Sequence, residues 1–545
     1  MNYPFGDSIF YTDQTPLISV PLKWLFHYFP ALASNSIAIY NWVMVLNMIV
    51  ASYLCYFILK RFIKTGWILI AGSIFLPWIS PQYLRLASGH MNLSLSCVVL
   101  GNIFLLVKLY ECQKNSTLIL YSVFNYLLLT FCFFIHAYYV FILVSFTGIF
   151  VATAAVFRRD YKILLAGLFA SLGSLLSVSL FMNYVDQWRQ LRETKSMIGY
   201  NWEYWQMHWG NLFTSYDWNF IRFPFSALKF VNYENYGYLG SYFLFSLLFI
   251  TILVWWSGEK RKVLPVVFWE NNSGKLLLAV VVSGLLCGLM SFGETSVSMD
   301  GNYRFHNIFN PAFYLRSYVQ ELSHIRCMSR YIFPFIFTAN IGMIALIDYY
   351  WNLSNNKLIG GIIVLLFVFG LSDARDAVNQ MNRDAWAKEN PFSEEKIANT
   401  QLLIQNYSDY QSILVIPFFH VGANNLSLEA EQQTHKYAFQ VAIKTGLPLM
   451  NSQMSRTPDY QVTAFASMFL SDTIPAEIKL LLSEKPILVV YDKKLSSDTE
   501  YNAPKEEPSH SVFIKANKFP ATMRMEILYE DDTRIFYKWF PKLKA

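Results

Sequence analysis

Ten long apolar segments constrain what this chain can fold into. A helix of about 17 to 25 predominantly apolar residues is long enough to cross a bilayer. The segments lie near 37–59, 66–80, 92–111, 117–134, 137–157, 163–183, 238–257, 275–292, 331–350 and 358–372, of which the second and the last are short. Charged residues make up only 15% of the chain, against about 25% of a soluble domain. The sequence therefore predicts a polytopic α-helical membrane protein whose first partner is the lipid bilayer.

Alternate loops between these segments carry the basic residues. They contain Lys60, Arg61 and Lys64, then Lys108 and Lys114, then Arg158, Arg159 and Lys162, then Lys260, Arg261 and Lys262, and finally Lys357. Cytoplasmic loops are enriched in Lys and Arg, so we expect these loops inside the cell. Residues 1–36, 184–237 and 293–330, and everything after residue 372, are then extracytoplasmic. Because the basic residues follow the apolar segments, the net charge of +6 does not indicate nucleic-acid binding.

The composition changes after Ser372. The apolar runs 412–419 and 486–492 are typical of buried strands. Residues 429–446 predict a helix that ends at Gly446, and residues 523–540 predict a hairpin. We therefore expect a transmembrane domain over residues 1–372 and an extracytoplasmic soluble domain of α/β or α+β type over residues 373–545.

The outer segment 184–237 is dense in aromatic residues. Aromatic rings with polar edges suit the faces of sugars, since a ligand site combines apolar surface with a few polar groups. We interpret the segment as a sugar- or acceptor-stacking surface, with Trp202, Trp205, Trp209 and Tyr216 as candidates. The alternative is an aromatic belt at the membrane interface.

Histidine and arginine side chains recur at the outer ends of the apolar segments. They are Arg85, His90, His136, His324, Arg326 and Arg330. Ionisable residues at span ends that face one compartment are candidates for a shared site, and the planar fork of Arg matches phosphate oxygens. The alternatives are hydrogen-bonded structural histidines and arginines that contact lipid headgroups.

Motifs for several other chemistries are missing from the sequence. It contains no phosphate-binding P-loop, dinucleotide fingerprint, HExxH zinc motif or GxSxG nucleophile elbow. The six cysteines, at positions 55, 97, 112, 132, 287 and 327, form no CxxC pair and are interpreted as packing residues. No metal site is predicted, although a divalent ion as cofactor stays open.

Four short stretches resemble the GT-C superfamily of polytopic membrane glycosyltransferases. They are YPFGDSIFYTDQTPL at 3–17, SGH at 88–90, IHAYY at 135–139 and RCMSRYIFP at 326–334. They look similar to a bacterial branch with an N-terminal YPFG-(D/E)-x-I-x-x-TD stretch. In that superfamily the catalytic acid follows a first span. Here no span precedes the YPFG stretch, which implies an N-terminally truncated chain; the alternative is a short tail that crosses the membrane unaided.

The resemblance implies a function in the bacterial plasma membrane. A sugar would pass from a polyprenyl-phosphate-linked donor to a glycan, lipid or protein acceptor of the cell envelope on the outer face. Asp7 or Asp13 would be the catalytic base. Arg326, Arg330 and His324 would bind the donor phosphate, and Arg85, His90 and His136 would bind sugar or phosphate oxygens.

Two other functions compete with this one. A transporter or flippase for a lipid-linked saccharide predicts ionisable residues near the middle of the spans, whereas Asp160 and Asp348 fall at span ends. A non-catalytic envelope protein that binds glycans needs no acid near a donor phosphate.

Overall fold

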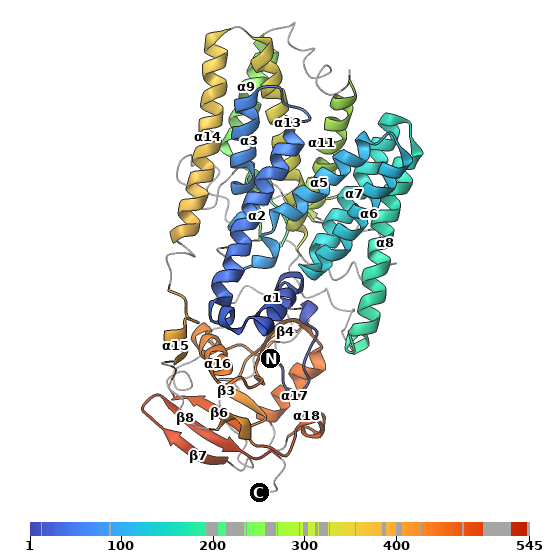
Figure 1. Cartoon of the computed structure of the whole chain (residues 1–545). Coiled ribbons are helices and arrows are strands. Elements are labelled where there is room, and N and C mark those ends of the chain that lie inside the picture. Colours follow the sequence, from blue (N-terminus) through green and yellow to red (C-terminus); the bar gives the residue numbers. More distant parts are fainter. Residues whose placement is uncertain are drawn as a thin grey trace. The chain divides into compact units, whose positions relative to one another are not determined.

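The structure is a computed structural model of the whole chain (Figure 1). The residues that it describes are 1–11, 14–86, 89–191, 205–213, 234–235, 237–256, 269, 271–293, 295–297, 304–310, 314, 325, 327–354, 356–383, 389–398, 400, 406–423, 427–470, 474–493 and 525–541.

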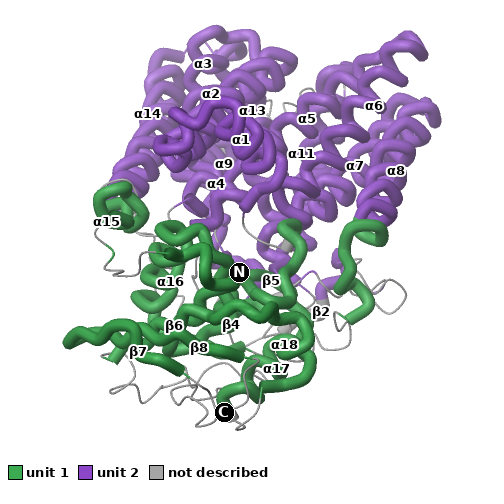
Figure 2. Tube along the Cα trace, turned by 60° about the horizontal axis from the view of Figure 1, so that its bottom comes forward, with its two compact units in different colours: residues 1–12, 182–201, 389–545 green, residues 13–181, 202–388 purple. Residues whose placement is uncertain are grey.

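Two compact units make up the chain, coloured separately in Figure 2. The helical unit comprises Asp13–Phe181 and Trp202–Lys388, and the α/β unit comprises Met1–Thr12, Met182–Asn201 and Glu389–Ala545. The sequence predicted two domains that meet at residue 372. The division in the structure differs, because the first residues of the chain belong to the same unit as the C-terminal residues. Which segments lie outside the membrane stays a prediction.

Most of the expected spans are present as helices in the helical unit. Their bounds are α1 (Pro16–Tyr28), α2 (Ser36–Leu59), α3 (Gly66–Trp78), α4 (Pro81–Leu84), α5 (Ser96–Glu111), α6 (Asn115–Phe131), α7 (Ala137–Arg158), α8 (Tyr161–Val185), α9 (Ser241–Trp256), α11 (Asn272–Met290), α13 (Ile332–Leu353) and α14 (Lys357–Met381). A short antiparallel pair, β1 (Thr295–Val297) and β2 (Arg304–His306), belongs to the same unit.

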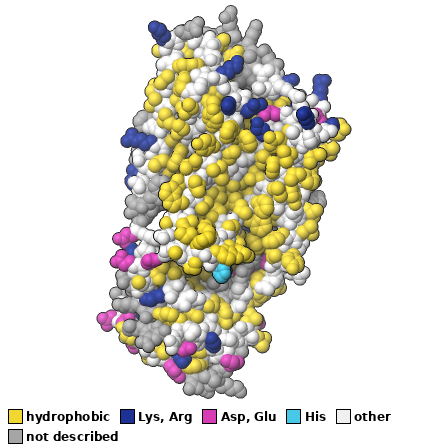
Figure 3. Space-filling model, viewed as in Figure 1, with side chains coloured by type: hydrophobic (Ala, Val, Ile, Leu, Met, Phe, Trp, Pro, Cys, Tyr) yellow, Lys and Arg dark blue, Asp and Glu magenta, His cyan; other side chains and the backbone are white. Residues whose placement is uncertain are grey.

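Nine helical segments among the described residues are long and apolar enough to cross a membrane. The tenth expected span, near 238–257, is α9, which is apolar but only 16 residues long. Hydrophobic side chains cover much of the viewed face of this unit (Figure 3), and Trp42, Leu46 and Tyr53 of α2 are among the exposed ones. The prediction of a polytopic helical membrane protein is confirmed.

Small and polar residues bring the helices into close contact. A Cβ atom on Gly284 of α11 would lie 1.7 Å from Thr338 Oγ1 of α13, so only glycine permits this approach. Asn102 of α5 donates to Asn125 Oδ1 of α6 at 2.8 Å and to Thr147 Oγ1 of α7 at 3.1 Å. Close approach and interhelical hydrogen bonds of this kind drive helix association in membranes.

Two buried carboxylates hold the ends of neighbouring helices. Asp348 accepts from the backbone N–H groups of Lys64 and Thr65 at 2.9 and 3.0 Å, at the start of α3. Asp373 accepts from the N–H and the hydroxyl of Ser241 at 2.5 and 2.6 Å, at the start of α9. The first N–H groups of a helix need such acceptors, so these acids have a structural role.

The α/β unit is built on a four-stranded sheet in the order β3-β6-β8-β7. Strands β3 (Ser412–Ile416) and β6 (Ile487–Asp492) are parallel, and β8 (Arg534–Trp539) is antiparallel to β6 and to β7 (Met525–Glu530). The remaining elements are α15 (Glu394–Ala398), the parallel pair β4 (His420–Ala423) and β5 (Ser452–Thr457), and the helices α16 (Gln432–Thr445), α17 (Asp459–Leu470) and α18 (Ala476–Leu481). The predicted C-terminal α/β region is confirmed.

The N-terminal residues are an integral part of the α/β unit. Asn2 is fully buried; its side chain donates to Gln461 Oε1 at 2.8 Å, and its Oδ1 lies 2.9 Å from His420 Nε2. The backbone N–H of Tyr3 donates to the carbonyl of Leu449 at 3.1 Å. Phe5 lies in the core of the unit, in edge contact with Phe465. The first part of the YPFG stretch therefore contributes to folding.

Candidate functional site

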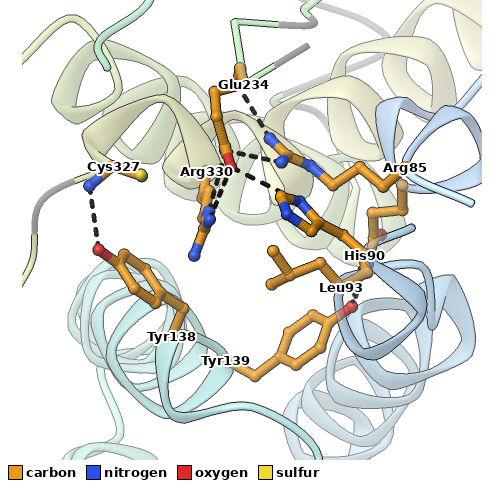
Figure 4. A network of polar contacts seen from close by, with 9 residues as sticks. Arg85, His90, Leu93, Tyr138, Tyr139, Glu234, Cys327 and Arg330 are labelled. Carbon is orange, nitrogen blue, oxygen red and sulfur yellow. Dashed lines mark hydrogen bonds and ion pairs between the residues drawn. The ribbon is translucent and has the colours of Figure 1, made fainter. Parts of the chain in front are cut away.

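Polar residues from five separate parts of the helical unit meet at one end of its helices. Arg85 directly follows α4, His90 lies ahead of α5, and His136 caps the N-terminus of α7. Glu234 precedes α9, and Arg330 belongs to the short helical turn that leads into α13. Figure 4 shows the side chains of Arg85, His90 and Arg330 directed toward Glu234. We call these five residues the arginine cluster.

The carboxylate of Glu234 holds both arginines. Arg85 Nη1 donates to Glu234 Oε2 at 2.6 Å, and Arg85 Nη2 donates to the backbone carbonyl of Glu234 at 3.0 Å. Arg330 donates with Nε to Oε2 at 3.1 Å and with Nη2 to Oε1 at 2.7 Å, which is the two-point geometry of a strong Arg–carboxylate pair. Arg85, Glu234 and Arg330 are 0%, 2% and 7% exposed, so the three charges are screened from water.

Aromatic contacts fix Arg330. Its guanidinium carbon lies 4.3 Å from the centre of the Tyr138 ring, an attractive cation–π geometry. The Tyr138 hydroxyl accepts from the backbone N–H of Cys327 at 3.0 Å, and the N–H of Ser329 donates to the carbonyl of Trp205 at 3.2 Å. The residues just ahead of Arg330 are thus tied to two neighbouring segments.

Donor capacity remains in the cluster after these contacts. Among the described residues, Arg85 Nε is buried without a hydrogen-bond acceptor. None of the hydrogen bonds of Arg330 within the described part of the chain uses Nη1. Two positive charges share one negative charge, so the Arg85–Glu234–Arg330 group has a net charge of +1 at neutral pH. An anionic ligand would meet unused N–H groups and an excess of positive charge.

The two histidines differ in their surroundings. His90 is 23% exposed, and its Nδ1 lies 3.6 Å from Glu234 Oε1. His136 Nδ1 accepts from the backbone N–H of Tyr138 at 3.1 Å, which leaves the proton of the neutral ring on Nε2. Burial lowers the pKa of His136 well below its ordinary value, and the positive charges of Arg330 and His90 lower it further. His136 is therefore a neutral donor through Nε2–H.

The arginines determine the ionisation of Glu234. Burial by itself would raise the pKa of Glu234, but Arg330 and Arg85 outweigh it and hold that pKa well below its ordinary value. The carboxylate stays ionised throughout the physiological range. A base with so low a pKa accepts protons poorly, so Glu234 is suited to hold the arginines and unsuited to general base catalysis.

A second polar network supports the segment between Arg85 and α5. Gln82 Nε2 donates to the Tyr139 hydroxyl at 2.6 Å, and that hydroxyl donates to the carbonyl of Leu93 at 2.9 Å. Gln82 and Tyr139 are buried. These bonds connect α4, α7 and the chain after His90, and so they fix the backbone on either side of the arginine cluster.

The structure brings four of the expected site residues together: Arg85, His90, His136 and Arg330. Asp7 belongs to the α/β unit, where its Oδ1 accepts from the N–H of Ser8 at 2.6 Å. Trp209 stacks on Phe292 with ring centres 4.2 Å apart. The other expected site residues, Asp13, Trp202, Tyr216, His324 and Arg326, lie outside the described residues.

The sequence analysis did not identify Glu234 as a site residue. It lies in the aromatic segment 184–237, which drew attention to its rings, and its two partners are 149 and 96 residues away along the chain. The one feature of the sequence that pointed to Glu234 is its position, a few residues ahead of the expected span at 238–257. The sequence pattern also gave Tyr138 no special role.

Within the described part of the chain, no group of three or more His, Cys, Asp or Glu side chains is placed to hold a metal ion.

Comparisons with known proteins place the chain in a family. The sequence model of a domain of unknown function, DUF6311, matches residues 1–374. The chain belongs to this family. No curated protein matches it.

Among solved structures, ArnT from Cupriavidus metallidurans, crystallised with undecaprenyl phosphate, is similar. The sequences are 10% identical, and the alignment covers 91% of this chain and 83% of that one with a TM-score of 0.38. A TM-score of this size does not establish a shared fold.

The paired charges of the cluster predict a large effect for Glu234→Gln. This change leaves two buried guanidinium groups with a neutral partner, and breaking a buried pair costs about 3–5 kcal/mol. We expect that loss in the free energy of unfolding, measured by denaturant titration in detergent micelles. The matched control is Glu111→Gln, which breaks the exposed pair with Arg61 and should cost about 1 kcal/mol or less. Equal effects of the two substitutions would contradict the burial argument.

The neutral state of His136 predicts a pH dependence. In the unfolded chain the residue binds a proton below about pH 6.5, whereas in the folded protein its pKa is lower. The stability from His136 is therefore fully present above pH 6.5 and is lost as the pH falls below it. We expect His136→Asn, which keeps a capping acceptor, to flatten the decline of the unfolding midpoint between pH 7 and pH 5. The exposed His27→Asn should leave the decline unchanged; a wild-type slope in His136→Asn would refute the prediction.

Proposed function

We propose that the protein is a GT-C-type membrane glycosyltransferase. It would transfer a hexosyl or pentosyl group from a polyprenyl-phosphate-linked donor to a cell-envelope acceptor on the outer face of the membrane. The observation that carries the proposal is the arginine cluster: two buried guanidinium groups, one of them with an Nη1 that makes no hydrogen bond among the described residues, at one end of a bundle of membrane helices. The motif resemblance of the YPFG, SGH, IHAYY and RCMSRYIFP stretches supports the same reading.

The position of the cluster suits a lipid-linked donor. Its residues come from segments between the second and third, fourth and fifth, sixth and seventh, and eighth and ninth expected spans, and all of these fall on the side opposite the basic loops. By the positive-inside rule this is the outer side. A polyprenyl phosphate has an apolar tail for the lipid phase and an anionic head at its boundary, where the cluster supplies N–H donors.

The residues divide the chemistry between them. In the transfer, the bond between the sugar C1 and the phosphate oxygen breaks, and a bond from C1 to the acceptor oxygen forms. Arg330, through the Nη1 donor that its contacts with described residues leave unused, would stabilise the charge that develops on the departing polyprenyl phosphate. His136, neutral with its proton on Nε2, would donate to a sugar or phosphate oxygen, and Arg85 would hold the position of Glu234.

The acceptor hydroxyl must lose its proton to a base. Glu234 has too low a pKa for this task. Asp13 or Asp7 in the YPFG stretch is the proposed base, following the resemblance. The proton would pass from the acceptor oxygen to the carboxylate as the new C1–O bond forms.

Replacing Arg330 tests the phosphate role. Arg330→Lys keeps the charge but loses the two-point contact, and we expect about a 10²-fold decrease in kcat/KM, the scale of losing one preorganised donor. The measurement is release of polyprenyl phosphate from a polyprenyl-phosphate sugar in proteoliposomes. Arg61→Lys, at a basic loop, is the matched control and should retain activity. If lipid-linked sugar crosses the bilayer without release of polyprenyl phosphate, the protein is a flippase; if neither occurs, a binding function gains support.

Replacing the acids tests the base. Asp13→Asn should decrease turnover by about 10²–10⁴-fold with expression unchanged, because a general base contributes that much. Asp7→Asn, measured in parallel, tells which of the two acids takes the proton. Unaltered turnover in the Asp13 variant would remove that residue from the mechanism.

A further inference from the structure

Helix α1 presents an uninterrupted apolar face that no described residue of the helical unit covers. Its outward residues are Leu17, Val20, Pro21, Trp24, Leu25 and Tyr28. They follow helical spacing of three and four residues, so they share one side of the helix. Trp24 and Tyr28 are 63% and 66% exposed, and no charged residue interrupts this face.

The opposite side of α1 rests on the helical unit. Ile18, Leu22 and Phe26 are half-buried on that side. The Tyr40 hydroxyl of α2 donates to Thr15 Oγ1, just ahead of α1, at 2.9 Å. The helix also contacts α2 and the turn Cys132–Phe134, which directly precedes His136. It is thus attached beside the segment that leads to His136 of the arginine cluster; Figure 1 shows α1 near one end of the helices.

We propose that α1 lies in the membrane interface and that its apolar face is covered by lipid. Thirteen residues span about 20 Å as a helix, too short to cross a hydrocarbon core of about 30 Å. A short helix with Trp and Tyr on its apolar face is typical of segments that lie in the plane of the interface.

Continuity with the spanning helices selects lipid over other occupants. The exposed face of α1 leads through Phe29 and Leu32 into α2, whose own exposed residues Trp42, Leu46 and Tyr53 face outward along the span. A contiguous exposed apolar surface of this kind is stable only when covered. Lys23 and His27 are exposed on the flank of the apolar face, where a basic side chain can reach headgroups.

An interfacial α1 would fix the depth of the arginine cluster in the membrane. If α1 marks the interface, the turn at Cys132–Phe134 and the adjacent His136 lie at headgroup level. This inference stands on the surface of α1 and does not depend on the transferase activity.

Photocrosslinking in the full-length protein tests it. A benzoylphenylalanine replaces Trp24 or Tyr28 on the outward face, and Phe26 on the inward face is the matched control, since each change replaces one aromatic ring by another. The protein is irradiated in nanodiscs of phosphatidylethanolamine and phosphatidylglycerol, and adducts are identified by mass spectrometry. We expect at least 10-fold more lipid adduct at positions 24 and 28 than at position 26.

Other outcomes overturn the proposal. A crosslink from position 24 to the protein, within the chain or to a second copy, would assign the face to a protein contact. Equal and low lipid adduct at all three positions would place α1 in water. Polyprenyl phosphate release, measured on the same samples, reports separately on the proposed activity.

Discussion

A single carboxylate holds the site together. Glu234 accepts hydrogen bonds from two buried arginines, one 149 residues before it and one 96 residues after it in the sequence. Removing three charges from water is costly, and only close, multiple hydrogen bonds compensate for it. The loop that ends the second span, the segment ahead of α9 and the turn before α13 are therefore fixed relative to one another. The histidines and the Tyr138 ring are arranged around this centre.

The same pairing separates two chemical roles. A carboxylate between two guanidinium groups remains an anion, so it can orient cations but cannot take up protons at neutral pH. The excess positive charge and the unused N–H groups favour an anionic ligand, while proton removal needs another acid. Asp348 and Asp373 are occupied at helix ends, and the acids of the YPFG stretch are the proposed source because of the motif resemblance.

Local sequence patterns predicted the helices and strands, but they did not predict contacts between residues that are far apart in the sequence. The apolar segments predicted nine spans and the short α9. Short apolar runs predicted β3 and β6, and residues 523–540 predicted the final hairpin. The rule for basic loops placed Arg85, His90, His136 and Arg330 on one side, where the structure brings them together. Glu234 stayed hidden because nothing near it in sequence indicates its partners. The packing of Phe5 in the α/β unit, with Phe465 far along the chain, was hidden for the same reason.

The burial of Asn2 has a consequence for biosynthesis. Its partners, His420, Asn451 and Gln461, are translated more than four hundred residues later. The α/β unit can therefore be completed only after residues 420–461, and the spanning helices that lie between them and Asn2 in the sequence, have been synthesised. Contacts of such sequence separation form slowly, so this unit is expected to fold after the spanning helices have formed.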